Sequence, residues 1–241
     1  MHVDVLEAVA STGIPLTVLS VDPHSLGSGE LGTLLPGFLA STSSVLRFSF
    51  TNVNIDVDGS EAEGQLFAKD NYSLLKSVLA SATALRHLEL ELRRNRGLRS
   101  NSQLTTELLK PHWHPMLSSL NLSTLAVTEV TLLNALVSWG RTLMVVQFNG
   151  VFMCGVKGEG WSDALMSLTT MPKLCEIRLF VIQDDGNVPG HSIVDLRHLK
   201  HGETTHCSYV NGKMHNNIIL RTRDEVKVGL QQLLEGELKY Y

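Results

Sequence analysis

Histidine and cysteine are the residue types in this sequence whose chemistry could support a metal site. His112 and His114 flank Trp113 between two prolines. A second group lies near the C-terminus and consists of His198, His201, His206 and Cys207. Imidazole and thiolate are ligands that zinc prefers, but the short Cys and His pairs of structural zinc modules are absent from the sequence. We therefore predict exposed histidine loops without a metal or cofactor, and keep a zinc site as the alternative.

Nucleophilic and acid/base catalysis require arrangements that the sequence does not contain. No serine stands in a Gly-x-Ser-x-Gly elbow, and no cysteine has a recognisable protease context. Cys154 has the most loop-like setting of the cysteines, and we expect it to pack beside Val151 and Phe152 as a small buried thiol. Because the acidic residues are scattered without a general acid/base pair, we predict that the chain is not an enzyme. A small α/β enzyme of unknown chemistry is the alternative.

The charge balance argues against a polyanion-binding protein. The chain has 20 Lys and Arg against 24 Asp and Glu, which gives a net charge of −4. Residues 93–99 form a basic run, but they lack nearby aromatic residues that could stack on bases. We interpret this run as a solvated loop and predict that the protein binds neither nucleic acid nor membrane.

Length and cysteine usage indicate the general class of protein. The 241 residues, 43% of them hydrophobic, suffice for one compact domain with a sizeable core. Three widely spaced cysteines fit free thiols in a reducing compartment better than a disulfide framework. The N-terminal residues lack the basic start and apolar core of a signal peptide. We therefore expect a cytoplasmic or nuclear location.

A repeated spacing of leucines and other apolar residues predicts the strands that would position these side chains. The chain contains 40 leucines, and the pattern apolar-x-x-apolar-x-apolar recurs with first positions between 26 and 40 residues apart. The last two apolar positions alternate as one buried face of a strand requires. The six instances are Leu16, Leu19, Val21; Val45, Phe48, Phe50; Leu85, Leu88, Leu90; Leu117, Leu120, Leu122; Leu143, Val146, Phe148; and Leu174, Ile177, Leu179.

Segments with helical periodicity precede these strands. The apolar sets with i, i+3 and i+4 spacing are Val3, Leu6, Val9, Ala10; Leu74, Leu75, Val78, Leu79; Leu132, Leu133, Leu136, Val137; and Trp161, Leu165, Leu168. Gly140 is a plausible residue to end the third helix. The pattern predicts an α/β fold, specifically an irregular leucine-rich-repeat solenoid with parallel strands on a concave face and helices outside. An ordinary doubly wound α/β domain is the alternative, although the glycines at 27, 29 and 32 do not complete its phosphate-binding motif.

The character of the sequence changes after residue 182. We predict that residues 1–182 form a solenoid of about six degenerate repeats and that residues 183–241 form a polar loop followed by a capping strand and helix. The strand is expected at Ile218–Leu220, and Thr222 with Glu225 forms a capping box. The apolar face of the final helix consists of Val226, Leu230, Leu233, Leu234 and Leu238. At the ninth repeat position there is no regular Asn, so we expect apolar packing and less regular turns.

Most of residues 1–182 resemble the repeat region of fungal F-box and leucine-rich-repeat proteins. The segments that carry the resemblance are VLEAVASTGIPLTVLSVD (5–22), LLKSVLASATALRHLELEL (74–92), LSSLNLSTLAVTEVTLLNALVSWGRTLMVVQFNGV (117–151) and WSDALMSLTTMPKLCEIRL (161–179). In that family the F-box docks on the adaptor of a cullin-type ubiquitin ligase and the repeats select the substrate. No F-box-like segment precedes the first strand here, so the resemblance implies a repeat region without its own F-box.

We predict a noncatalytic protein–protein interaction module whose concave, strand-lined face binds a protein partner through shape and hydrogen bonds. Substrate recognition in an F-box-type ubiquitin ligase, together with ligase components, is the alternative role. An uncapped N-terminal repeat would also leave an apolar end that a homodimer could cover. The candidate partner-binding residues are Arg47, His87, Glu89, Glu91, Asn121, Gln147, Asn149 and Arg178.

Overall fold

The protein was analysed as a computed structural model. The structure describes residues 8, 11–12, 16–21, 42, 45, 47–54, 75–93, 101–155, 160–184, 192–195, 207–210, 213–216, 218–235 and 239–240. The first predicted helix, the glycine-rich segment around residue 29 and three of the C-terminal histidines lie wholly or mostly outside these ranges.

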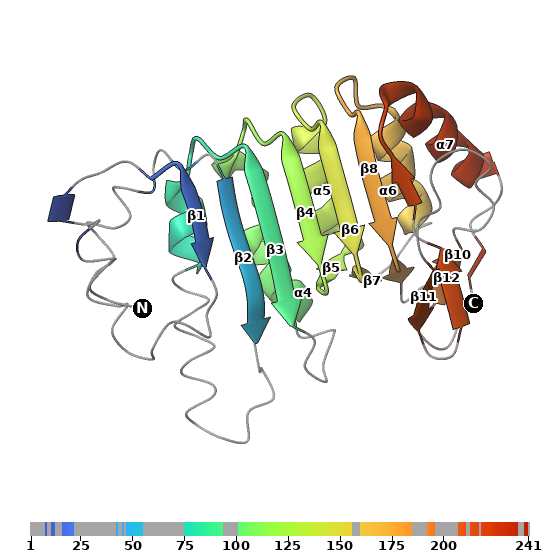
Figure 1. Ribbon diagram of the computed structural model, residues 1–241, viewed down its shortest axis with the longest axis horizontal. Helices are drawn as coiled ribbons and strands as arrows, with labels where there is room; N and C mark the ends of the chain where they lie inside the picture. The colour runs from blue at the N-terminus through green and yellow to red at the C-terminus, as the bar shows by residue number, and fades with distance from the viewer. Residues whose placement is uncertain are drawn as a thin grey trace, which may run out of the picture.

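A mostly parallel sheet of seven strands dominates the described part of the chain (Figure 1). Its strands, in spatial order, are β1 (Val18–Val21), β2 (Arg47–Asn54), β3 (His87–Arg93), β4 (Ser119–Ser123), β6 (Val145–Asn149), β8 (Glu176–Phe180) and β13 (Ile218–Leu220). All neighbours are parallel except β13, which pairs antiparallel with β8. The α/β class predicted from the sequence is therefore confirmed.

The repeated apolar spacing sets the register of the six parallel strands. The fourth positions of the pattern are paired from one strand to the next across the sheet: Leu19, Phe48, Leu88, Leu120, Val146 and Ile177. All of these except the half-buried Leu19 are buried in the core. Because side chains alternate along a strand, the residues between them face the other side of the sheet. The predicted strand positions are thus confirmed, and the structure adds their register.

Helices lie behind this sheet in Figure 1 and cover one of its faces. They are a helical segment at 75–81, α4 (Asn101–Leu108), α5 (Glu129–Trp139) and α6 (Trp161–Thr169), with a 3-10 turn η3 (Pro111–Trp113) after α4. The predicted helices around residues 75–79, 132–137 and 161–168 are confirmed, whereas α4 was not predicted. Thr128 caps α5 by accepting a hydrogen bond from the Thr131 backbone N–H at 3.2 Å.

The predicted apolar face of α5 is wrong at one end. The helix buries Leu132, Leu136 and Trp139, but Val137 has 71% of its surface exposed. The reason is the helical rotation of about 100° per residue, which directs Val137 away from the sheet when its neighbour Leu136 faces it. Gly140 is the C-cap as predicted, and its φ of −57° is an ordinary right-handed value that does not require glycine.

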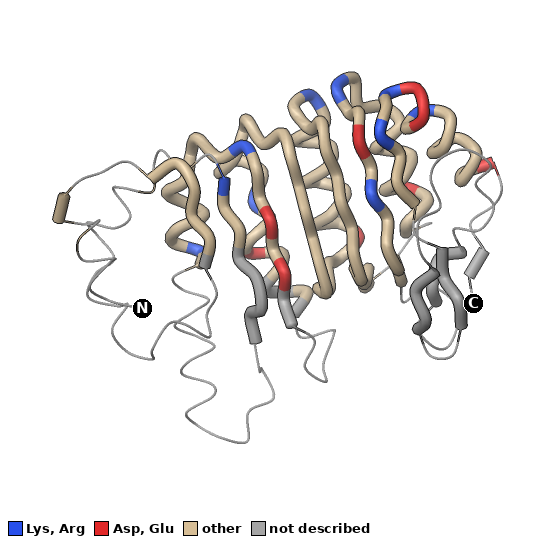
Figure 2. Tube along the Cα trace, in the orientation of Figure 1, with Lys and Arg blue, Asp and Glu red and all other residues tan. Residues whose placement is uncertain are grey.

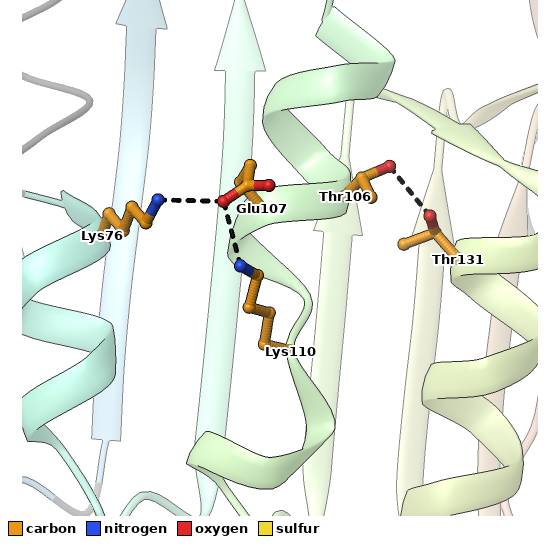
Figure 3. A network of polar contacts seen from close by, with 5 residues as sticks. All are labelled: Lys76, Thr106, Glu107, Lys110 and Thr131. Carbon is orange, nitrogen blue, oxygen red and sulfur yellow. Dashed lines mark hydrogen bonds and ion pairs between the residues drawn. The ribbon is translucent and has the colours of Figure 1, made fainter.

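Polar contacts join successive helices along this layer (Figure 3). Lys76 Nζ lies 2.9 Å from Glu107 Oε2 on α4, and Lys110 Nζ lies 3.0 Å from the same oxygen. Hydrogen bonds from the two ammonium groups hold the pKa of Glu107 below its ordinary value. The hydroxyls of Thr106 and Thr131, 2.8 Å apart, join α4 to α5. The helices are therefore linked to one another as well as to the sheet.

A second sheet of shorter strands runs beside the first and was not predicted. Its strands are β5 (Ala126–Thr128), β7 (Phe152–Cys154), β9 (Gln183–Asp184), β10 (Ser192–Asp195) and β14 (Lys239–Tyr240), with β5, β7 and β9 parallel. Cys154 thus lies in a strand and not in a loop. The expected burial of this thiol is confirmed, because Cys154 is 5% exposed and donates to the Val127 carbonyl at 3.4 Å.

The turns between the two sheets share one backbone geometry. Thr124, Gly150 and Val181 follow β4, β6 and β8 at equivalent positions, and all have positive φ values of 50°, 62° and 50°. The next residues, at 125, 151 and 182, are buried apolar side chains. The predicted apolar packing is confirmed, but the expectation of less regular turns is wrong for these three units.

Replacing Gly150 by valine should lower the free energy of unfolding by about 1–2 kcal/mol, because a branched side chain is strained at positive φ. The added Cβ would lie 3.5 Å from Thr124 Cγ2, an ordinary contact, so backbone strain and not collision is the cause. Urea unfolding measures the effect. Asn149→Val is the control, because residue 149 is next to Gly150 in the chain but lies in the extended backbone of β6. Equal stability of G150V and the wild type would contradict the assigned turn geometry.

The C-terminal part adds one strand and one helix to the end of the main sheet. The predicted strand Ile218–Leu220 is β13, and α7 (Arg223–Glu235) follows and packs on α6. The capping box is confirmed: the Glu225 N–H donates to Thr222 Oγ1 at 3.2 Å, and the Thr222 N–H donates to Glu225 Oε2 at 3.3 Å. Three of the four described residues on the predicted helix face, at 226, 230 and 233, are buried, and Leu234 is half-buried.

The expected polar loop after residue 182 contains more strand than we predicted. Besides β9 and β10, it holds β11 (Cys207–Val210), which forms a hairpin with β12 (Lys213–Asn216). These strands are two to four residues long, too short for hydrophobic alternation to identify them. Within the described part of the chain, none of the helices has the length and apolar character needed to cross a bilayer.

Candidate partner-binding surface

The sheet face opposite the helices, called here the open face, carries rows of polar side chains. Strand pairing sets Ser49, Glu89, Asn121, Gln147 and Arg178 side by side across β2, β3, β4, β6 and β8. All five are half-buried, which is the exposure expected for neighbouring side chains on a sheet surface. We call this set the central row. It is a continuous line of hydrogen-bonding groups on rigid strands.

Glu89 is held in place within the central row. Its two carboxylate oxygens accept hydrogen bonds from Ser49 Oγ and from Asn121 Nδ2, both at 2.8 Å. Ser123 Oγ in turn donates to Asn121 Oδ1 at 3.3 Å. Three adjacent strands therefore fix the orientation of one carboxylate. A pre-oriented group loses little conformational entropy when a partner binds it.

A second row lies toward the start of the strands and is basic at one end. It consists of Arg47, His87, Ser119, Val145 and Glu176. Partial burial, and then the nearby guanidinium groups of Arg47 and Arg86, lower the pKa of His87 below its ordinary value. His87 is therefore a neutral imidazole at pH 7, able to donate one hydrogen bond and accept another.

Arg178 on β8 is already engaged by a neighbour. Its Nε lies 2.6 Å and its Nη2 2.5 Å from Glu176 Oε1. The pair is partly exposed on the open face. Exposed ion pairs of this kind contribute at most about 1 kcal/mol to stability. Arg178 could exchange this partner for a carboxylate of a bound protein.

Charge is unevenly distributed over the open face (Figure 2). Glu89 and Glu91 place two acids on β3, whereas β8 carries the Glu176–Arg178 pair. The two strands between them, β4 and β6, have no charged side chain on either face. Their open-face groups are hydroxyls, amides and one valine. This centre suits hydrogen bonding to a protein surface and offers no cations for a phosphate backbone.

All eight sequence-predicted site residues lie on strands of the open face. The structure brings Glu89 and Asn121 into direct contact, while Gln147 and Asn149 make no side-chain hydrogen bond within the described residues. Arg86, which is not among the predicted residues, is exposed beside His87 directly before β3.

The histidines at 112 and 114 are not a matched pair. His112 is exposed, whereas His114 is fully buried and its Nδ1 lies 3.3 Å from the Ala82 carbonyl oxygen. The prediction of an exposed loop is therefore wrong for His114, because it turns inward from η3. Within the described residues, no group of three or more His, Cys, Asp or Glu side chains is placed to hold a metal ion.

No family model matches the sequence, and no curated protein matches it significantly.

Proposed function

We propose that the chain is a noncatalytic interaction module, built as a leucine-rich-repeat solenoid of the kind found in fungal F-box and leucine-rich-repeat proteins. Its open face binds a protein partner. The observation that carries the proposal is the central row, which aligns hydrogen-bonding side chains from five consecutive strands.

The arrangement of the strands supports a solenoid. The six parallel strands follow each other across the sheet in chain order, and within the described residues helices lie on one side of it only. A doubly wound fold, by contrast, reverses its strand order and covers both faces with helices. The parallel strands β5, β7 and β9 of the second sheet and the repeated left-handed turn add further equivalent positions to successive units. Repeat proteins commonly bind partners on such extended strand surfaces.

The chemistry of the open face favours a protein as the occupant. Amide, hydroxyl and carboxylate groups recognise peptide N–H groups and side-chain donors. The carboxylate of Glu89 is fixed by its neighbours, so it would present a defined acceptor to a Lys, Arg or backbone N–H. Such charge-assisted hydrogen bonds are stronger than neutral ones.

Substituting Glu89 and Asn121 together by alanine should weaken partner binding by about tenfold or more, because two hydrogen-bonding groups of roughly 1 kcal/mol each are lost. The measurement is affinity purification of the tagged chain from its native cells, with quantitative mass spectrometry. Partners that bind the open face should be depleted with the double variant.

The matched control is the double variant Gln231→Ala and Glu235→Ala. It removes another amide–carboxylate hydrogen bond, of 2.9 Å, from the exposed side of α7. Partners should be retained with this control. Identical partner sets for the wild type and for the Glu89/Asn121 variant would contradict the proposed surface. Ubiquitin-ligase adaptors among the depleted partners would assign the module to such a ligase.

A further inference from the structure

A groove of about 300 Å³ opens between the C-terminal ends of α5 and α6, away from the open face. Its volume is about ten times that of a water molecule in the liquid, which gives room for one or two side chains. The lining residues are Leu136, Val137, Gly140, Arg141, Ser167, Thr170, Met171 and Pro172. The set is mostly apolar and includes no acid and no aromatic ring.

The walls of the groove present apolar surface to solvent. Val137 is 71% exposed, the largest exposed fraction among the described large apolar side chains. Two backbone carbonyls along the walls already accept hydrogen bonds: the Val137 carbonyl accepts from the Gly140 N–H, and the Ser167 carbonyl accepts from the Thr170 hydroxyl at 2.8 Å. An apolar side chain would therefore enter without leaving these groups unpaired.

Two cations lie on the adjacent loops that follow α5 and α6. Arg141 lines the groove, and Lys173 follows directly after Pro172. The loops lie side by side because the Cys175 N–H donates to the Met144 carbonyl at 2.9 Å. Both cations are exposed, and neither makes an ion pair within the described residues. In Figure 2 blue segments lie on the loops that precede β6 and β8.

We infer that this groove is a second docking site, which takes an acidic segment of a protein partner: an aliphatic side chain enters between α5 and α6 while flanking carboxylates pair with Arg141 and Lys173. Charge complementarity specifies the acidic flanks, and the apolar walls specify the inserted side chain. A nucleic acid would use the cations but not the walls, because the groove lacks rings on which bases could stack. The site is separate from the open face, so it can be tested independently of the function proposed there.

The probe is a displayed library of random short peptides, selected on the purified chain. We expect enrichment of peptides with Asp or Glu beside Leu, Ile or Met. The affinity of a synthesised selected peptide, measured by fluorescence anisotropy, should fall about fivefold with Arg141→Ala and by a similar factor with Lys173→Ala. It should also fall as salt is raised.

Each substitution has a control of the same chemical type. Val137→Ser should weaken binding several-fold, whereas Val130→Ser, at another exposed valine of α5, should not. Arg86→Ala removes an exposed cation directly before β3, which β4 separates from β6. This variant should also leave peptide binding unchanged. Far-ultraviolet circular dichroism and urea unfolding confirm that each variant is folded.

Three results would overturn the inference. One is the absence of enriched peptides, or enrichment of peptides without acidic residues. Another is an equal loss of affinity with Arg86→Ala and Arg141→Ala, which would show that only the general charge of the edge matters. The third is tighter binding of single-stranded DNA or of vesicles rich in anionic lipid than of the selected peptide, with the same dependence on Arg141 and Lys173.

Discussion

Substitution of Trp161 by alanine should lower the free energy of unfolding by about 3–5 kcal/mol, which approaches the whole stability of many domains. The side chain is fully buried and packs on Phe148 with ring centroids 5.5 Å apart. Its Nε1 donates a 2.7 Å hydrogen bond to the Gln183 carbonyl. Trp161 therefore joins α6, the main sheet and β9, and its removal leaves a cavity at their junction.

Trp139 provides the matched control for the hydrogen bond. It is equally buried, but its Nε1 has no hydrogen-bond partner among the described residues. Trp161→Phe loses a buried hydrogen bond, whereas Trp139→Phe removes an unsatisfied donor. Urea unfolding should show the larger destabilisation for the change at position 161. A smaller or equal effect there would contradict the packing described for the second sheet.

Lowering the pH from 6.5 to 4 should destabilise the protein by about 3 kcal/mol through His114 alone. Burial is the main cause that lowers the pKa of His114, to about 4. Its Nδ1 faces a carbonyl oxygen and must carry the proton in the neutral form, so Nε2 is a buried acceptor without a partner in the described residues. A second proton would place an unpaired charge in the core.

The direction of the effect follows from proton binding. In the unfolded chain His114 takes up a proton near pH 6.5, whereas in the folded chain it does so only near pH 4. The stabilising contribution of neutral His114 is therefore complete above pH 6.5 and declines as the pH falls from 6.5 to 4. It changes little below pH 4, where the folded chain binds the proton as well. Urea unfolding across the window measures this contribution.

His114→Met should remove this component of the pH dependence, since methionine fills a buried site without titrating. The Ala82 carbonyl would keep the hydrogen bond that it accepts from the Leu85 N–H at 3.1 Å. His112→Gln changes an exposed histidine and should leave most of the component in place, because burial and not the charge of His112 is the main cause that lowers the pKa of His114. An unchanged pH dependence in His114→Met would show that this side chain is not the buried titrating group.

The strands of the main sheet could be predicted because their periodicity is simple. Apolar residues two apart, such as the buried Leu120 and Leu122, are visible in the sequence and recur in all six predicted repeats. The helices α5 and α6 contain enough apolar residues to show helical spacing. The repeat also predicted correctly that the polar residues between the apolar strand positions lie on the opposite face of the sheet.

The elements that were missed have weak hydrophobic signals. The helix α4 buries Ser102 and Thr105 together with Leu108, so its buried face is only partly apolar in the sequence. The strands of the second sheet are two to four residues long, too short for alternation to distinguish them from a turn. Tertiary pairing decides their conformation.

The candidate site could be predicted in outline but not in its interactions. That Glu89 and Asn121 lie on neighbouring strands followed from the repeat, whereas the hydrogen bond between them depends on side-chain conformations. The groove between α5 and α6 was not predicted, because Val137 was assigned to the buried face. The helix turns by about 100° per residue, so Leu136 lies in the core while the next residue, Val137, lies on the surface that lines the groove.

Site-specific photocrosslinking in the native cells tests most directly whether the open face is where a protein partner binds. A photoreactive amino acid at Gln147, in the middle of the central row, would be compared with one at Gln231, exposed on α7. The account predicts a discrete crosslinked protein from position 147 that is absent from position 231 and is lost when Glu89 and Asn121 are substituted. Crosslinks from position 231 alone, or none from position 147, would contradict it.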